Sequence, residues 1–137
     1  MSATELATIA FEDDGRATVA TIRGEVDLSN ADRLLDELMA RVGATRWLVV
    51  DLTGCSYLDS AGLRVIARLD VRCRDVGSGL RLVVDRGGSI DRVLEMTRMD
   101  EVLTIHRRLD DALVSTVRDV DGENPEVGGT DGGAGGP

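Results

Sequence analysis

The chain has 137 residues, enough for one domain with a hydrophobic core, and its 16 basic and 25 acidic residues give a net charge of −9. This charge would repel a phosphate backbone and argues against direct nucleic-acid binding. All the basic residues are Arg, and without Lys there is no Schiff-base chemistry, no Walker phosphate-loop lysine and no receiver-domain lysine.

The sequence also bears on the cellular compartment. Two cysteines are too few for a secreted disulfide framework, and the first thirty residues contain no apolar core typical of a signal peptide. No apolar run is long enough to cross a bilayer. We therefore expect a soluble cytoplasmic protein without direct membrane contact.

The chain is expected to open with an antiparallel hairpin. Residues 6–11 and 17–24 have the composition of short strands. Asp14 and Gly15 lie between them, and an Asp-Gly pair is a strong hairpin signal.

An amphipathic helix is predicted next, over residues 29–42, with Ser29 or Asn30 available as its cap. Its apolar residues at helical spacing are Leu34, Leu35, Leu38, Met39 and Val42.

The remaining elements alternate between strand and helix. Strands are predicted over 47–52, 80–84 and 102–106, and helices over 60–76, 89–99 and 109–120. The strand at 47–52 is almost wholly apolar, as expected where both faces of a sheet are covered. This order predicts one α/β domain over residues 1–118, with a mixed β-sheet (an antiparallel opening hairpin, then mostly parallel strands) packed against about four helices.

Residues 119–137 differ in composition from the rest of the chain. They contain seven glycines and five acids and no basic residue. Such a segment cannot bury enough apolar area to offset its conformational entropy, so we expect a disordered acidic Gly-rich tail. The alternative, that this tail is a binding segment, stays open.

The segment that invites a chemical interpretation is C-S-Y-L-D-S-A-G-L, residues 55–63. A nucleophile elbow would need Gly-x-Ser-x-Gly and a base, but position 58 is Leu and the one histidine, His106, lies in a later predicted strand. We therefore expect no enzyme activity. Two interpretations remain for Ser60: a helix cap, for which Asp59 is the other candidate, or a phosphorylation site.

Phosphorylation of Ser60 would change a surface rather than the fold. Free amides and the dipole at the helix start could tolerate the added charge of about −1.5 to −2. Gly62 leaves room for a kinase or a partner to approach. A partner pressed against the loop would meet this charge beside Asp59, so the complex would be lost while the domain survives.

The predicted helix carries a cationic stripe on the side opposite its apolar residues. Steps of four from Ser60 reach Arg64, Arg68 and Arg72. The stripe is either an ordinary solvated face or, together with Ser60, part of a binding surface.

The two cysteines have different expected environments. Cys73 falls on the apolar side of the helix and is expected to be buried. Cys55 is expected in the loop, where oxidation or alkylation of its thiol could disturb the surface around Ser60. Ser56 is a second loop hydroxyl that could be modified instead of Ser60.

The run V-V-D-L-T-G-C-S-Y-L-D-S-A-G-L, with I-R-G-E-V-D-L-S at residues 22–29, resembles the STAS-domain anti-sigma factor antagonists, a bacterial family of anti-anti-sigma factors. The similarity covers about residues 5–118 and includes V-L-T-I-H-R-R-L-D-D-A-L. The D-S-A-G-L element is its most diagnostic motif.

This resemblance implies partner switching in the regulation of transcription and of stress responses. An unphosphorylated antagonist binds an anti-sigma factor serine kinase and frees a sigma factor; phosphorylation at Ser60 ends binding, and a PP2C-type serine phosphatase restores it. The chain itself then needs no cofactor. The expected partner-binding residues are Asp27, Ser29, Asp59, Ser60, Ala61, Gly62, Leu63 and Arg64. The alternative is a STAS scaffold or sensor module of a larger signalling assembly.

Overall fold

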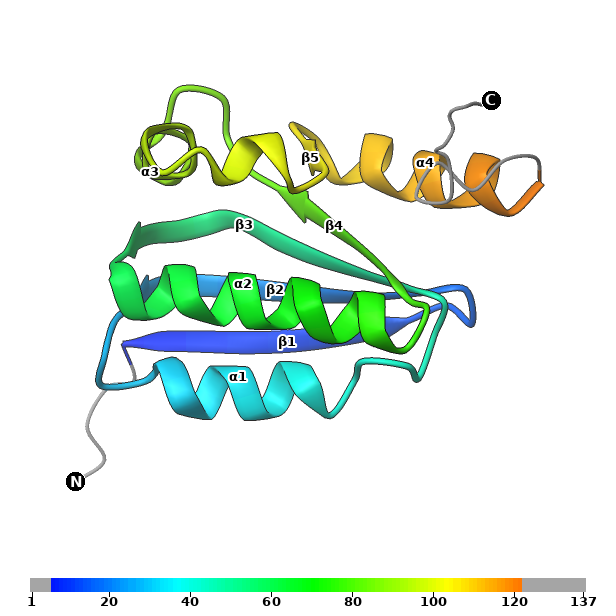
Figure 1. The fold of residues 1–137 in the computed structure, drawn as a ribbon, viewed down its shortest axis with the longest axis horizontal. Helices are drawn as coiled ribbons and strands as arrows, with labels where there is room; N and C mark the ends of the chain where they lie inside the picture. Colours follow the sequence, from blue (N-terminus) through cyan, green and yellow to red (C-terminus); the bar gives the residue numbers. More distant parts are fainter. Residues whose placement is uncertain (1–5, 122–137) are drawn as a thin grey trace.

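The computed structural model describes residues 6–121, and the side chains of residues 6–117. Five strands form one mixed sheet and follow each other across it in chain order (Figure 1). They are β1 (Ala7–Asp13), β2 (Ala17–Val26), β3 (Trp47–Leu58), β4 (Gly79–Val83) and β5 (Ile105–His106). β1 is antiparallel to β2, and the other neighbours are parallel, which confirms the predicted fold class.

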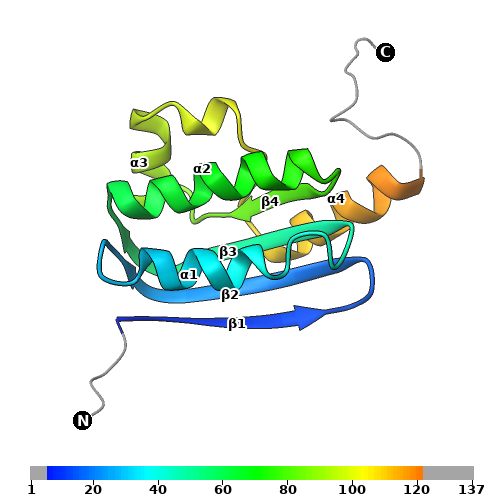
Figure 2. The ribbon, with the colours of Figure 1, turned by 60° about the horizontal axis from the view of Figure 1, so that its bottom comes forward.

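Helices cover both faces of this sheet. They are α1 (Ala31–Met39), α2 (Ser60–Asp75), α3 (Ser89–Met96) and α4 (Leu109–Asp121), with a short 3-10 helix, η1 (Met99–Glu101), after α3. α1 and α2 lie side by side on one face, and α4 lies against the other (Figure 2).

The alternating side chains of β3 show why its sequence is apolar nearly throughout. Leu48 and Val50 belong to the large core beneath α1 and α2. Trp47 and Val49 point to the opposite face, where they pack with Ala112 of α4. A strand buried on both faces needs apolar residues at successive positions.

The opening hairpin forms at the predicted turn. The Asp14 carboxylate accepts hydrogen bonds from the amides of Ala17, at 2.8 Å, and Arg16, at 3.1 Å. These bonds stabilise the ionised form and lower the pKa of Asp14. Gly15 adopts φ +87°, a conformation that few other residues accept.

The largest error of the sequence prediction is the length of β3, which continues to Leu58 rather than ending at Leu52. Two register shifts, each with one extra residue in β3 opposite Thr21–Arg23 and Gly24–Glu25 of β2, keep the two strands paired to their ends. A bulge lets pairing continue past residues that do not suit a regular ladder. The predicted loop is therefore largely strand.

Smaller differences concern the ends of elements. α1 covers fewer residues than predicted, α3 ends at Met96, and β5 contains only Ile105 and His106. α4 continues through Asp121, beyond the predicted domain end at residue 118. The first glycine after the start of α4 is Gly122, so no strong helix breaker lies at residue 119. The predicted disorder of residues 122–137 lies outside the described part of the chain.

Candidate functional site

The carboxyl ends of β2 and β3 meet at one end of the sheet. Val26 pairs with Leu58, and the Asp59 amide donates to the Val26 carbonyl at 3.2 Å. The segments that follow these two strands are therefore neighbours, although about thirty residues separate them in the chain. One begins with Asp27 and the other with Asp59 and Ser60.

Asp59 is the N-cap of α2. Its Oδ1 accepts hydrogen bonds from Ala61 N at 2.9 Å and from Gly62 N at 3.1 Å. Its backbone is extended, with φ −95° and ψ −168°, as is usual for a capping residue. Of the two residues considered as caps, Asp59 takes this role.

Ser60 is the first residue of α2, and it is exposed. Its hydroxyl makes no hydrogen bond to any residue in the described part of the chain. The expected free amides for a phosphate are not available at Ala61 and Gly62, because the Asp59 carboxylate already occupies them. A phosphate on Ser60 would therefore lie close to a carboxylate instead of being neutralised by these amides.

Asp27 organises the loop between β2 and α1. Its Oδ1 accepts from the Ser29 amide at 2.9 Å and from the Ser29 hydroxyl at 2.5 Å. Its carbonyl accepts from the Asn30 and Ala31 amides. Asp27 thus serves as a helix-entry residue, and Ser29 is exposed beside it.

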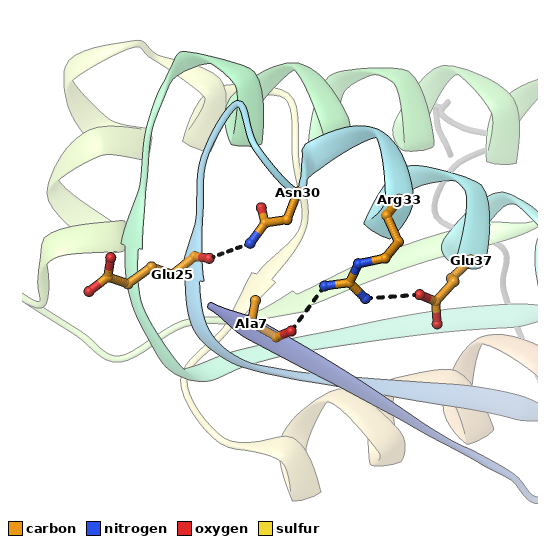
Figure 3. Close-up of polar contacts among 5 residues, drawn as sticks. All are labelled: Ala7, Glu25, Asn30, Arg33 and Glu37. Carbon is orange, nitrogen blue, oxygen red and sulfur yellow. Dashed lines mark hydrogen bonds and ion pairs between the residues drawn. The ribbon is translucent and has the colours of Figure 1, made fainter. Parts of the chain in front are cut away.

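Asn30 fixes this loop to the end of β2 (Figure 3). Its side-chain amide donates to the Glu25 carbonyl at 2.9 Å, and its Oδ1 accepts from the Asp27 amide at 3.0 Å. Asn30 occupies the N-cap position of α1, but its side chain bonds to the preceding loop and not to the helix. Buried polar groups that are satisfied in this way hold a loop in one conformation.

α1 is also tied to the edge of the sheet, as Figure 3 shows. Arg33 Nη2 donates to the Ala7 carbonyl of β1 at 3.0 Å, and Arg33 Nη1 pairs with Glu37 at 3.1 Å. α1 is therefore anchored to β1 and, through Asn30, to β2, which holds the loop that begins with Asp27 at the end of β2.

Two of the expected partner-binding residues, Ala61 and Gly62, are buried and contribute little to the surface around Ser60. A Cβ atom at Gly62 would lie 2.6 Å from Leu58 Cδ1 and 3.2 Å from Val26 Cγ1. The structure thus gives a packing reason for this glycine: it lets the first turn of α2 approach the ends of β2 and β3. Leu63 is half-buried, and Arg64 is exposed one turn after Ser60.

Three exposed residues at this end of the sheet were not singled out from the sequence. Leu28 is 78% exposed in the loop after β2, and Tyr57 is 50% exposed near the end of β3. Ser89, the first residue of α3, donates its hydroxyl to the Ser56 carbonyl at 3.0 Å. Exposed Leu and Tyr beside a polar centre are typical of protein-binding surfaces. The only sign of such a surface in the sequence was that Leu28 and Tyr57 fall within predicted loops.

The environment of Cys55 contradicts the expectation of an accessible loop thiol. Cys55 lies in β3, is buried, and donates its thiol to the Tyr57 carbonyl at 3.3 Å. Burial raises the pKa of Cys55 and raises that of Cys73 to about 11, so neither is a ready thiolate. Ser56 is exposed, but it too is part of the strand, and its hydroxyl donates to the Gly24 carbonyl at 3.4 Å.

The described residues offer no alternative centre of metal chemistry: no group of three or more His, Cys, Asp or Glu among them could hold a metal ion. None of their helices is long and apolar enough to span a membrane.

The chain is similar to known proteins in both sequence and structure. The STAS domain family model matches residues 8–112. The anti-sigma-F factor antagonist RsfB of Mycobacterium tuberculosis is 31% identical over 116 residues, which cover 82% of this chain and 92% of RsfB. The chain belongs to the STAS-domain anti-sigma factor antagonist family.

Two further relatives of this STAS domain differ in length. Osmosensory protein A of Mycobacterium tuberculosis is 30% identical over 101 residues, which cover 69% of this chain but only 64% of that protein. The crystal structure of an anti-sigma factor antagonist from Mycobacterium paratuberculosis has a TM-score of 0.75 and 26% identity and covers 85% of this chain and 99% of that one.

Anti-sigma factor antagonists are regulators and not enzymes. In this STAS domain, the exposed Ser60 lies at the same end of the sheet as the exposed side chains of Leu28 and Tyr57.

Proposed function

We propose that this chain binds an anti-sigma factor serine kinase while Ser60 is unphosphorylated and thereby releases a sigma factor. Phosphorylation of Ser60 ends the binding, and a PP2C-type serine phosphatase restores it. We place this exchange in the cytoplasm, where the kinase meets ATP and the sigma factor. The observation that carries the proposal is the exposed Ser60 hydroxyl, which directly follows the Asp59 cap and has no hydrogen-bond partner among the described residues.

The switch depends on where the new charge lies. The kinase transfers the γ-phosphoryl group of ATP to Ser60 Oγ, which loses its proton, and ADP leaves. The product carries about two negative charges next to the Asp59 carboxylate, whose Oδ1 is held by two amides and cannot move without uncapping α2. Burying this pair of anions in an interface costs far more than burying a hydroxyl.

The proposed docking surface combines apolar and polar residues. Leu28 and Tyr57 supply exposed apolar contacts on either side of the point where β2 and β3 end. Asp27 uses Oδ1 within its own loop, and its Oδ2 accepts no hydrogen bond from the described residues, so it is available to a cationic group of the partner. Arg64 extends the surface along α2.

The first test is binding and phosphorylation by an anti-sigma factor kinase, beginning with the anti-sigma-F factor for which RsfB is named. We expect one phosphate, on Ser60, found by intact-mass and fragment analysis after incubation with Mg·ATP. Ser60→Ala should keep binding, and Ser60→Asp should weaken it at least about tenfold, a change of about 1.4 kcal/mol. Arg64→Ala should weaken binding without unfolding the domain.

Ser56→Ala is the matched control, since Ser56 is another exposed serine at the same end of the sheet. It should change neither phosphorylation nor binding. Phosphate on Ser56 in place of Ser60, or equal binding by the Ala and Asp forms at position 60, would exclude the proposed switch.

A second candidate is a STAS scaffold or sensor module, and the similarity to a protein named for osmosensing supports it. Such a module should assemble with itself or with related STAS domains, whereas the antagonist should pair with one kinase. Sedimentation of the chain alone and with the kinase distinguishes the two.

A further inference from the structure

Three arginines on α2 have no acidic partner among the described residues. Arg64, Arg68 and Arg72 are exposed, and their spacing of four residues places them about 6 Å apart along the helix. By contrast, Arg74 of the same helix pairs with Asp70 at 3.1 Å, and Arg33 of α1 pairs with Glu37 at 3.1 Å. The stripe of three is thus an uncompensated positive edge on a chain whose net charge is negative.

A shallow groove of about 380 Å³ runs beside this stripe between α1 and α2. Met39, Ala67 and Val71 provide apolar lining, and Val71 is 57% exposed. Arg68 and Arg72 also line the groove, with Asp75 at its far end. This combination suits an acidic segment that carries a few apolar side chains.

We propose that the groove binds residues 122–137 of this same chain, called here the acidic segment. It contains Glu123, Glu126 and Asp131 and no basic residue, so its charge is opposite to that of the stripe. Pro125 and Val127 lie among these acids and supply apolar side chains for Met39 and Val71. The acidic segment thus offers negative charges to three arginines that have no acidic partner among the described residues.

The acidic segment begins at a place from which it can reach the groove. α1, α2 and α4 run in the same direction, so α4 ends beyond the same end of the sheet as the carboxyl halves of α1 and α2 (Figures 1 and 2). Sixteen extended residues reach about 50 Å, roughly twice the length of α2 at about 24 Å. The acidic segment can therefore cross from α4 to the face that carries the groove.

The position of Asp75 sets the direction of docking. Asp75 repels an acidic segment at the carboxyl end of the groove, whereas Arg68 and Arg72 attract it further toward the start of α2. Because all these groups are exposed, the attraction is screened by salt. The docked state should therefore weaken steeply as ionic strength rises.

A nitroxide spin label on the full-length chain tests this proposal. The label is placed at Thr130→Cys, since Cys55 and Cys73 are buried and do not compete for the reagent. At low salt, we expect the amide NMR signals of residues 67–72 to lose intensity. The loss should disappear at about 1 M salt, where the Debye length is only about 3 Å.

Two full-length variants identify the charges that are responsible. Glu123→Gln with Glu126→Gln and Asp131→Asn, and separately Arg68→Gln with Arg72→Gln, should each abolish the loss of intensity. The matched control, Arg86→Gln with Arg92→Gln, removes two other exposed arginines and should leave it unchanged. Dilution should also have no effect, because the contact lies within one molecule.

Three outcomes overturn the proposal. They are an unaffected α2, broadening that is as strong around Arg86 and Arg92, and broadening that vanishes on dilution with unlabelled chain, which would identify a second copy as the occupant. The test uses the chain alone, so its failure leaves the proposed function untouched. If both proposals hold, the docked segment lies along α2 from Ala67 onward, one turn beyond Arg64 of the proposed kinase-binding surface.

Discussion

Asp59 and Ser60 are adjacent residues with different physical roles. Asp59 holds two amides at the start of α2, and Ser60 leaves its hydroxyl exposed. The cap must remain in place for Ser60 to keep its position. The acid of the D-S-A-G-L element is therefore first a structural residue, whatever it contributes to a partner.

Replacing Asp59 separates its structural role from its charge. Asp59→Ala should lower the free energy of unfolding by about 0.5–2 kcal/mol, because Ala61 N and Gly62 N lose their acceptor. Asp59→Asn keeps an acceptor oxygen and should cost much less. Urea unfolding of both variants checks this, and equal losses for Ala and Asn would show that the carboxylate charge and not the cap matters.

Replacing Gly62 by Ala should have two effects of opposite sign on the free energy of unfolding. In an open helix, Gly→Ala stabilises by about 1 kcal/mol. At Gly62 the new Cβ would lie 2.6 Å from Leu58 Cδ1 and 2.7 Å from Leu58 Cγ. Overpacking of this kind costs about 1–3 kcal/mol, so we expect Gly62→Ala to lower the free energy of unfolding.

Gly88→Ala is the control for this substitution. Its new Cβ would have ordinary contacts, the nearest at 3.5 Å to the Asp85 carbonyl, and the backbone does not require glycine. Because Gly88 is the N-cap of α3, where Gly is preferred to Ala, the cap loss offsets the entropic gain, and stability should stay close to that of the native chain. A Gly62→Ala variant of native stability would mean that Leu58 repacks without cost.

At the scale of elements, an ion pair joins α3 to the chain just after β5. Asp91 of α3 accepts from the Gly87 amide and pairs with Arg107, each at 2.8 Å. The Gly87 amide is the main cause of the lowered pKa of Asp91, and Arg107 is the second. The last, short strand depends on such contacts because it has only two residues in the sheet.

Asp91→Asn should therefore reduce stability in a pH-dependent way. A carboxyl group with a lowered pKa in the folded state stabilises above its unfolded pKa, near about 3.9, and this contribution is lost as the pH falls through the folded value. The deficit of Asp91→Asn should be full at neutral pH and should shrink as the pH falls below the unfolded pKa of the carboxyl group. Urea midpoints across this range measure it.

Asp100→Asn serves as the comparison, since Asp100 is exposed and has no hydrogen bond or ion pair in the described structure. It should change stability little at any pH. A deficit of Asp91→Asn that is independent of pH would assign its effect to geometry instead of charge.

At the scale of the whole molecule, one sheet separates two cores. Trp47, the one tryptophan of the chain, lies on the α4 side, where the Arg81 guanidinium stacks 4.5 Å from the centre of its ring. Leu69 lies on the other side, in the core beneath α2. Because β2, β3 and β4 contribute side chains to both cores, we expect the two to unfold together.

Leu69→Ala tests this coupling from a distance. It should cost about 2–5 kcal/mol and should shift the Trp47 fluorescence transition and the far-UV circular dichroism transition by the same amount. A fluorescence transition that stays in place while the dichroism transition moves would show that the two cores unfold separately.

Much of this architecture could be read from local patterns. The Asp14-Gly15 pair predicted the hairpin, and the apolar run at Trp47 predicted a strand covered on both faces. Helical spacing predicted α2 from Ser60 to within one residue of its observed end. These features depend on residues a few positions apart, which is why the sequence contains them directly.

The sequence by itself therefore determined the order and type of the elements and the position of Ser60 at a helix start. Only the tertiary structure decided that β3 reaches Leu58, that Cys55 is buried, that Gly62 packs against Leu58, and that the segment after Val26 lies next to the segment after Leu58. Each of these depends on which strands pair and in what register. Pairing brings together residues far apart in the chain, and no local propensity encodes that.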